Sequence, residues 1–333
     1  MQAHNWRPTA PLATARHRAQ MLGRAREFFA SRGVLEVETP LLSQTTVTDP
    51  HIESIRAELQ LDAQRPYFLQ TSPEYFMKRL LAAGYPDIFQ ICKAFRDGEC
   101  GRRHQPEFTL VEWYRRDYDL QQIMREASNF ITLLLDPRFL RSSPLFVEYA
   151  EMLRQHTGID PGSASLDQLV RAAEPDRQLI DSLGDDRDAW LDLLLSTRVT
   201  PHFADGRLTV LYHYPAAQAA LARLCEDDSS VADRFEIFFG DLELANGFVE
   251  LQSAEEQSRR FARDQEIRRQ RSQRVRPLDR RLLAALEEGL PDCAGVAVGF
   301  DRLLMINEMA DDIRRVQSFA DGDGGRAAAD TVG

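Results

Sequence analysis

Arginine and histidine side chains are concentrated in the segment from Phe95 to Tyr114, which reads FRDGECGRRHQPEFTLVEWY. Its hydrogen-bond donors include Arg96 and His104, and glycines between them favour a flexible loop. A guanidinium group can donate two parallel hydrogen bonds to a pair of phosphate oxygens, so the segment is suited to bind a polyphosphate. A solvated, charged hairpin has the same composition, and for a basic loop considered alone that interpretation is favoured.

A second group consists of Glu236, Glu243 and Glu250, which follow one another at intervals of seven residues among Phe, Leu, Ile and Val. Carboxylates in apolar surroundings are costly unless a cation or a metal ion compensates their charge. Mg²⁺ typically takes one or two carboxylates together with substrate phosphates. The group therefore indicates a Mg²⁺ site, and the alternative is an exposed sheet face that carries three solvated charges.

Short strands are expected to position both groups. Residues 88–92 are apolar and residues 108–114 alternate in polarity, so the basic segment is predicted to join two strands. Residues 234–239 and 242–251 are predicted to form two more strands, with a turn at Gly240. The donors and the carboxylates should then lie on one kind of scaffold, a sheet and its connecting loops.

Helices are predicted on either side of these strands. Residues 13–31 place apolar side chains at intervals of three or four until Gly33 ends the helix. Ser72 and Pro73 are suited to the cap and first turn of another helix. Residues 120–224 contain helix-like stretches broken by Pro and Gly, and we assign them no chemistry.

Composition limits the possible partners and compartments. The chain has 333 residues and a formal charge of −11, which argues against a protein whose main activity is to bind nucleic acid. Its four cysteines form no C-x-x-C pair, so we expect reduced structural thiols and no zinc site or disulfide framework. No apolar run is long enough for a membrane helix, and the polar N-terminus does not resemble a signal peptide. We expect a cytoplasmic protein.

Three segments resemble the motifs of class II aminoacyl-tRNA synthetases, in the form used by the aspartyl, asparaginyl and lysyl subgroup. Residues 95–114 resemble motif 2, residues 28–42 resemble motif 1, and residues 295–305 resemble motif 3, in the family's order. The resemblance implies an α+β fold in which helices flank an antiparallel sheet. Motif 1 implies a homodimer, although its helix could also be an ordinary amphipathic core helix.

The same resemblance implies a domain plan. Residues 1–12 would be an N-terminal arm and residues 13–319 the catalytic domain, with a helical insertion at about 120–224 and a disordered tail at 320–333. Lysyl-tRNA synthetases carry an oligonucleotide-binding barrel before motif 1, which here begins close to the start of the sequence. We therefore expect no such barrel and no binding of a tRNA anticodon.

ATP binding is implied by the motifs rather than by a phosphate loop, because no G-x-x-x-x-G-K-[ST] sequence is present. By resemblance, Arg96 would bind the α-phosphate, while Arg302 and His104 contact the distal phosphates. Phe108 would stack on adenine, with Arg302 on the other face of the base. Arg96 and Arg302 are the expected catalytic residues. The metal pair would be Glu236 and Glu243, and further ATP contacts are expected from Asp97, Gly98, Glu99, Gln105, Leu244 and Gly299.

The amino-acid substrate is expected to resemble lysine. By resemblance, its pocket would be lined by Ser72, Pro73, Glu74, Glu112, Tyr114, Asn246, Glu250 and Ala297. Several carboxylates suit a substrate with two ammonium groups. An aspartyl or asparaginyl enzyme would require cations instead.

The short chain and the F-R-x-G-E form of motif 2 are similar to bacterial lysyl-tRNA synthetase paralogues that attach (R)-β-lysine to translation elongation factor P. Gly98 and Gln105 depart from the usual motif 2 residues of the tRNA enzymes. Ala297 replaces a glycine in motif 3, and its methyl group could penalise α-lysine or merely fill a gap in the core. A free-amino-acid ligase and a catalytically inactive regulatory paralogue remain the alternatives.

Overall fold

The computed structural model describes residues 6–60 and 65–320. Contacts between Cα atoms divide the chain into two compact units. The first consists of Met1–Trp113, Ala254–Leu290 and Gly299–Gly333, and the second of Tyr114–Ser253 and Pro291–Val298. The chain passes from the first unit to the second within a single strand, β6 (Glu107–Arg116).

The first unit contains a long N-terminal helix, α1 (Leu12–Ala30), and the parallel strand pair of β1 (Leu35–Glu36) and β5 (Ile88–Phe95). Phe29 of α1 stacks on Phe89 of β5 with ring centroids 4.3 Å apart, so α1 packs on this strand through buried aromatic side chains. A separate small sheet has the order β2 (Leu42–Ser43), β4 (Tyr67–Leu69), β3 (Arg56–Ala57).

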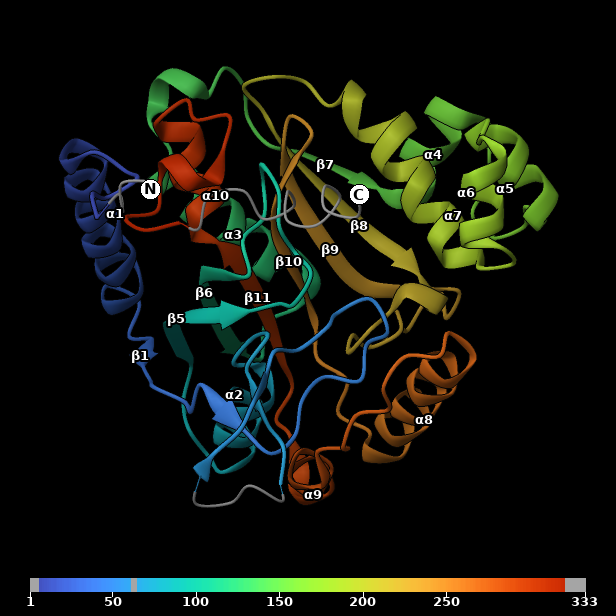
Figure 1. Cartoon of the computed structure of the whole chain (residues 1–333), viewed down its shortest axis with the longest axis horizontal. Coiled ribbons are helices and arrows are strands. Elements are labelled where there is room, and N and C mark those ends of the chain that lie inside the picture. Colours follow the sequence, from blue (N-terminus) through green and yellow to red (C-terminus); the bar gives the residue numbers. More distant parts are fainter. Residues whose placement is uncertain (1–5, 61–64, 321–333) are drawn as a thin grey trace, which may run out of the picture. The chain divides into compact units, whose positions relative to one another are not determined.

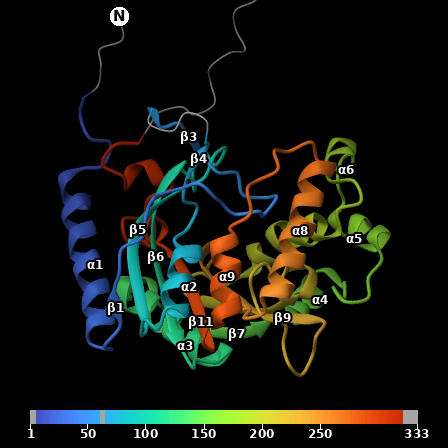
Figure 2. The ribbon, with the colours of Figure 1, turned by 90° about the horizontal axis from the view of Figure 1, so that it is seen from below.

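Helices complete the first unit. Figure 2 shows α2 (Glu74–Ala82) beside α9 (Arg280–Gly289), and these two helices are in contact. The other helical elements are α8 (Ala254–Gln270), α10 (Phe300–Asn307) and the 3₁₀ turn η6 (Ile313–Arg315). Phe300, Leu303 and Leu304 are buried, so the first turns of α10 are anchored in the core.

The second unit is built on strands with the order β11 (Cys293–Gly299), β10 (Leu242–Val249), β9 (Val231–Phe239), β8 (Leu208–Pro215), β7 (Leu145–Glu148). Neighbouring strands from β11 to β8 are antiparallel, whereas β7 and β8 are parallel. Figure 1 shows β8, β9 and β10 side by side. Gly240 forms the turn between β9 and β10 with φ +56°, where glycine is favoured.

Helices of the second unit form a separate buried cluster around Trp190 and Tyr149. Helix α3 (Leu120–Leu134) begins at a capping box made by Asp119 and Gln122. The other helices of the second unit are α4 (Tyr149–Thr157), α5 (Leu166–Ala173), α6 (Arg177–Leu183) and α7 (Arg187–Leu194). Its short single-turn elements are η2 (Pro137–Phe139), which precedes β7, and η3 (Leu195–Val199), η4 (Thr200–His202) and η5 (Ala216–Gln218).

The observed fold is α+β with helices and a mixed sheet, as expected. The expected antiparallel pairing holds for the strands that carry the glutamates, and parallel pairs occur at β1 with β5 and at β7 with β8. The tail expected at 320–333 lies outside the described residues from 321 onward. Across the described part of the chain, no helix is both long and apolar enough to cross a membrane.

Candidate active site

Arg96 stands at the end of β5, where the basic loop begins. Its backbone N–H donates to the Pro106 carbonyl at 2.9 Å, which closes the loop against β6. Its guanidinium lies over the Phe108 ring, 5.1 Å from the ring centroid, and 3.4 Å from the Glu99 carboxylate. Arg96 Nε is buried without a hydrogen-bond partner among the described residues, which fits a donor intended for an anion. The predicted α-phosphate and adenine residues are therefore adjacent.

Arg302 reaches the same loop from α10. Its guanidinium nitrogen lies 2.6 Å from His104 Nε2, within a small turn in which Gly101 and His104 form a β-bridge. Both side chains are exposed or partly exposed, so they are available to a ligand. The structure brings together the two residues that were predicted to contact the distal phosphates.

Asp301 was missed by the sequence reasoning, although it directly precedes Arg302. Its side chain is 1% exposed; one oxygen lies 2.5 Å from Arg18 and the other accepts the Thr109 N–H at 2.8 Å. Arg18 also donates to the Thr109 hydroxyl at 2.6 Å. A single buried carboxylate therefore links α1, β6 and α10, which carry motifs 1, 2 and 3.

Glu74 is the first residue of α2, and the N-cap is Pro73 rather than the expected Ser72. The Ser72 hydroxyl accepts the Glu74 N–H at 3.1 Å, and Pro73 is buried. Its carboxylate lies 2.6 Å from Lys78 Nζ, and Lys78 is 2% exposed. The sequence reasoning did not anticipate this pair. An ammonium ligand at Glu74 would share the carboxylate with Lys78.

The second unit presents a row of three predicted residues. Glu236, Asn246 and Ala297 are register partners on β9, β10 and β11, so their side chains share one sheet face. All three are partly exposed, whereas Val296 and Val298 on the opposite side of β11 are buried. Ala297 therefore does not fill a gap in the core, and its methyl group lies on the accessible face.

Glu250 and Tyr114 meet on this face at Gly295, two residues before Ala297. A Cβ atom added to Gly295 would lie 2.5 Å from the Tyr114 ring and 2.6 Å from Glu250 Oε1. Glu250 and Tyr114 are 0% and 2% exposed, so only glycine leaves room for both side chains here. As the first glycine of motif 3, Gly295 was already part of the family resemblance, and the structure shows why this position excludes a side chain.

The carboxylate of Glu236 lies near a second carboxylate, that of Glu243. Arg234 and the Tyr214 hydroxyl donate to its two oxygens at 2.6 Å and 2.7 Å. Burial, followed by the nearby Glu243 carboxylate, raises the pKa of Glu236 to about 7, although Arg234 opposes the rise. Two neighbouring carboxylates fit a divalent cation, because a positive charge between them would favour the ionised form of both.

The other predicted residues occupy the following positions. Glu112 and Gln105 are buried in the first unit, Asp97 and Gly98 are exposed in the loop after β5, Leu244 is buried in β10, and Gly299 caps α10. Ser72, Glu74 and Glu112 belong to the first unit, whereas Tyr114, Asn246, Glu250 and Ala297 belong to the second.

Comparisons with known proteins identify the family. Residues 5–322 match the family model described as tRNA synthetases class II (D, K and N). A protein of Sodalis glossinidius named elongation factor P--(R)-beta-lysine ligase is 45% identical over 320 residues, which cover 95% of this chain and 97% of that protein. A protein of the same name from Mannheimia succiniciproducens is 45% identical, over 94% of this chain and 97% of that protein. One from Haemophilus ducreyi is 44% identical, over 95% of this chain and 96% of that protein. The chain belongs to the class II tRNA synthetase family of the aspartyl, lysyl and asparaginyl type, and within it to the group of these relatives.

Proposed function

We propose that the protein is an ATP-dependent ligase that activates (R)-β-lysine as an acyl-adenylate and transfers it to the side-chain amine of a lysine on translation elongation factor P. The observation that carries this proposal is identity of about 45% over nearly the whole chain with relatives named for that reaction. The buried Glu250 carboxylate, which meets Tyr114 at Gly295, supports a substrate that carries an ammonium group on its side chain.

The first step joins the substrate carboxylate to the α-phosphorus of ATP while the bond from that phosphorus to the bridging oxygen breaks, which releases pyrophosphate. Arg96 would neutralise the α-phosphate, and Arg302 with His104 would hold the distal phosphates. Phe108 would stack on adenine. Charge neutralisation and positioning supply most of the catalysis in such a transfer, so no general base is required.

ATP would bind as its Mg²⁺ complex, and the residues suited to the ion are Glu243 and Glu236. The raised pKa of Glu236, caused first by burial and then by the nearby Glu243 carboxylate, supports this assignment. The cation would neutralise charge on the phosphates. Arg234 holds Glu236 at 2.6 Å, so this side chain is already oriented before the ion binds.

The second step transfers the acyl group. The neutral lysine amine of the acceptor attacks the carbonyl carbon, AMP leaves, and the amine loses a proton as the amide forms. In the second unit, Glu250 and Tyr114 would bind the distal ammonium of β-lysine, and Asn246 would be a further amino-acid contact. In the first unit, the family resemblance implies that Glu74 receives an ammonium group and that Glu112 contributes to binding the side-chain ammonium.

We also propose a cytoplasmic homodimer. Its support is the exposed apolar side chains in and beside motif 1: Leu12, Leu35 and Leu41 are 67%, 45% and 41% exposed. A contiguous patch of exposed apolar side chains marks a surface that a partner covers, and we propose that Leu35 and Leu41 belong to such a patch.

Pyrophosphate exchange tests the proposed function. The purified protein should catalyse amino-acid-dependent exchange with (R)-β-lysine more efficiently than with (S)-β-lysine or α-lysine. Purified elongation factor P should then discharge the adenylate and release AMP. Exchange with asparagine or aspartate, or none with any lysine isomer, would contradict the proposal.

A further inference from the structure

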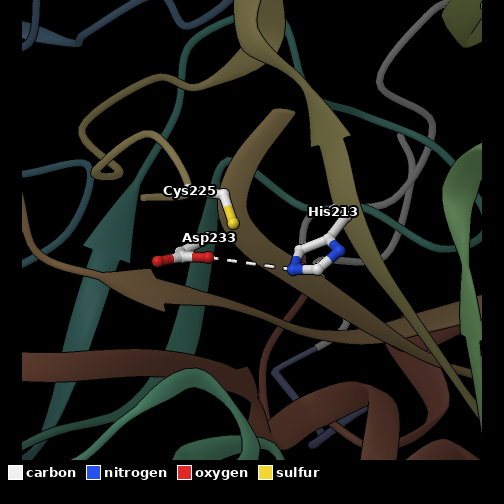
Figure 3. A group of neighbouring side chains, drawn as sticks. All are labelled: His213, Cys225 and Asp233. Atoms are coloured by element: carbon white, nitrogen blue, oxygen red, sulfur yellow. Dashed lines mark ion pairs between the residues drawn. The ribbon is translucent and has the colours of Figure 1, made fainter. Parts of the chain in front are cut away.

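His213, Cys225 and Asp233 form a cluster in the second unit that the proposed reaction does not use. Figure 3 shows the three side chains pointing toward one another from β8, from the segment before β9, and from β9. One donor atom from each lies within 4.8 Å of the other two. No zinc site was expected from the sequence, because the four cysteines form no C-x-x-C pair and these three donors are separated along the chain.

The backbone of β8 is shaped to direct His213 into the cluster. His213 has φ +58° and lies at the bulge between Tyr212 and Tyr214, where the register with β9 shifts. A bulge changes the direction of a side chain relative to a regular strand. The bulge therefore brings an imidazole to the side of β8 on which Asp233 lies.

The two imidazole nitrogens face different carboxylates. His213 Nδ1 lies 3.5 Å from Glu148 Oε1, and Nε2 lies 3.8 Å from Asp233 Oδ1. Metal-binding histidines commonly donate the second ring N–H to a carboxylate, which fixes the tautomer. Glu148 is in position to hold the proton on Nδ1, so that Nε2 presents its lone pair to the cluster.

The two carboxylate oxygens of Asp233 face different side chains, one in the cluster and one outside it. Oδ1 faces His213, while Oδ2 lies 3.7 Å from Arg223. The Cys225 Sγ lies within 4.8 Å of an oxygen of the same carboxylate. Asp233 is 8% exposed, whereas His213 and Cys225 are partly exposed, so the cluster can be reached from solvent at one side.

From this geometry we propose that His213, Cys225 and Asp233 bind a divalent cation of the Zn²⁺ class. Imidazole, thiolate and carboxylate are the ligands that Zn²⁺ takes, at about 2.0–2.3 Å, and tetrahedral geometry then places donors about 3.3–3.8 Å apart. The Nε2 to Oδ1 distance of 3.8 Å is a few tenths of an ångström longer than a nitrogen and an oxygen would have on one tetrahedral ion, so a small approach of the two side chains would complete the geometry. Three protein ligands leave the fourth position to water, and Cys225 releases its proton to solvent when the ion binds.

A bound ion would stabilise the segment that carries Cys225. This segment contacts Glu250, which is proposed to bind the substrate. Ala222 forms a β-bridge with Glu250, and Arg223 donates its backbone N–H to the Val249 carbonyl at 2.8 Å. Cys225 lies three residues beyond Ala222 on this segment, and its N–H donates to Val231 of β9 at 3.0 Å. Occupancy should therefore stabilise the backbone beside Glu250. This consequence rests on the proposed function, whereas ion binding itself does not.

Cobalt is a spectroscopic probe for such a site. We expect the full-length, chelator-treated protein to bind one Co²⁺ with a thiolate-to-metal charge-transfer absorption, and Zn²⁺ to displace it. Cys225→Ser should abolish the absorption, and Glu148→Gln should weaken binding by about 10–100-fold, as the loss of an outer hydrogen bond to a metal-bound histidine does. The matched control is Cys100→Ser, which alters an exposed free cysteine and should retain the band.

A measurement on the unmodified protein covers the case in which a variant does not fold. Zn²⁺ should slow alkylation of Cys225 by iodoacetamide at least tenfold, as followed by mass spectrometry of its peptide, and leave Cys100 in the same sample unaffected. Absence of a sulfur charge-transfer band in the folded protein, a band that survives Cys225→Ser, or equal alkylation rates with and without Zn²⁺ would each overturn the proposal. None of these readouts requires ligase activity.

Discussion

Arg18 and Asp301 form an ion pair in which the closest atoms are 2.5 Å apart and both side chains are mostly buried. The first residue belongs to the N-terminal helix and the second to the helix of motif 3, so the pair fixes two distant segments of the chain in the first unit. Asp301 also accepts the Thr109 N–H, which adds the strand of motif 2.

Removal of the Asp301 carboxylate should destabilise the protein strongly. Asp301→Ala leaves Arg18 with an uncompensated buried charge, and breaking such a pair costs about 3–5 kcal/mol. Denaturant unfolding at a fixed protein concentration measures the change. The matched control is Asp311→Ala, whose carboxylate is 70% exposed and pairs with Arg315, and this variant should lose at most about 1 kcal/mol. Equal losses in the two variants would contradict the anchoring role of Asp301.

Replacement of the adjacent Arg302 should impair activity rather than stability. The side chain contacts the partly open loop at His104 rather than the core, so Arg302→Ala should abolish pyrophosphate exchange and leave the melting temperature nearly unchanged. Exchange at the wild-type rate in this variant would remove Arg302 from the catalytic site. The two variants together distinguish the structural role of Asp301 from the phosphate-binding role proposed for Arg302.

The carboxylate of Glu236 should make metal use dependent on pH. Its pKa in the folded protein is raised from 4.5 to about 7, so the proton stabilises the metal-free fold and this stability is lost as pH rises from about 4.5 to about 7. Mg²⁺ binds the ionised form. At subsaturating Mg²⁺, exchange should therefore rise with a midpoint near pH 7, and excess Mg²⁺ should move that midpoint to lower pH.

Glu236→Gln is the control for this pH dependence. Glutamine keeps the shape of the side chain and has no carboxylate to titrate, so the component near pH 7 should disappear from the profile of exchange against pH. If the variant and the wild type have the same profile at low Mg²⁺, another group is responsible and Glu236 is not part of the metal site.

Ala297 should set the preference between β-lysine and α-lysine. Its methyl group lies on the accessible face in register with Asn246 and two residues from Gly295, where Tyr114 and Glu250 meet. Displacement of a substrate by one methyl group costs about 1–3 kcal/mol, or roughly ten- to two-hundredfold in discrimination. Ala297→Gly should raise kcat/KM for α-lysine relative to β-lysine by such a factor. An unchanged ratio in an active variant would exclude this role.

Local patterns predicted the elements that carry the motifs. The helix expected at 13–31 is observed as Leu12–Ala30, and the strands expected at 234–239 and 242–251 are observed as Val231–Phe239 and Leu242–Val249. Apolar periodicity and turn residues act over a few positions, so they are visible in the sequence.

Contacts between distant residues could not be predicted in this way. Asp301 meets Arg18 across 283 positions, and Gly295 is restricted by Tyr114, which lies far earlier in the chain. The pair of Glu74 and Lys78 is local, and its spacing of four on a helix was a signal that could have been used. The expected contacts of the amino-acid and ATP residues with their ligands stay predictions.

Mass spectrometry of elongation factor P tests the central proposal most directly. Purified factor incubated with this protein, ATP, Mg²⁺ and (R)-β-lysine should gain the mass of one β-lysyl group on one lysine side chain, and the gain should be lost without ATP or with Arg302→Ala. α-Lysine at the same concentration should give much less product. An unmodified factor in the presence of a protein that forms the adenylate would contradict the proposed acceptor, and modification with α-lysine in preference to β-lysine would contradict the proposed substrate.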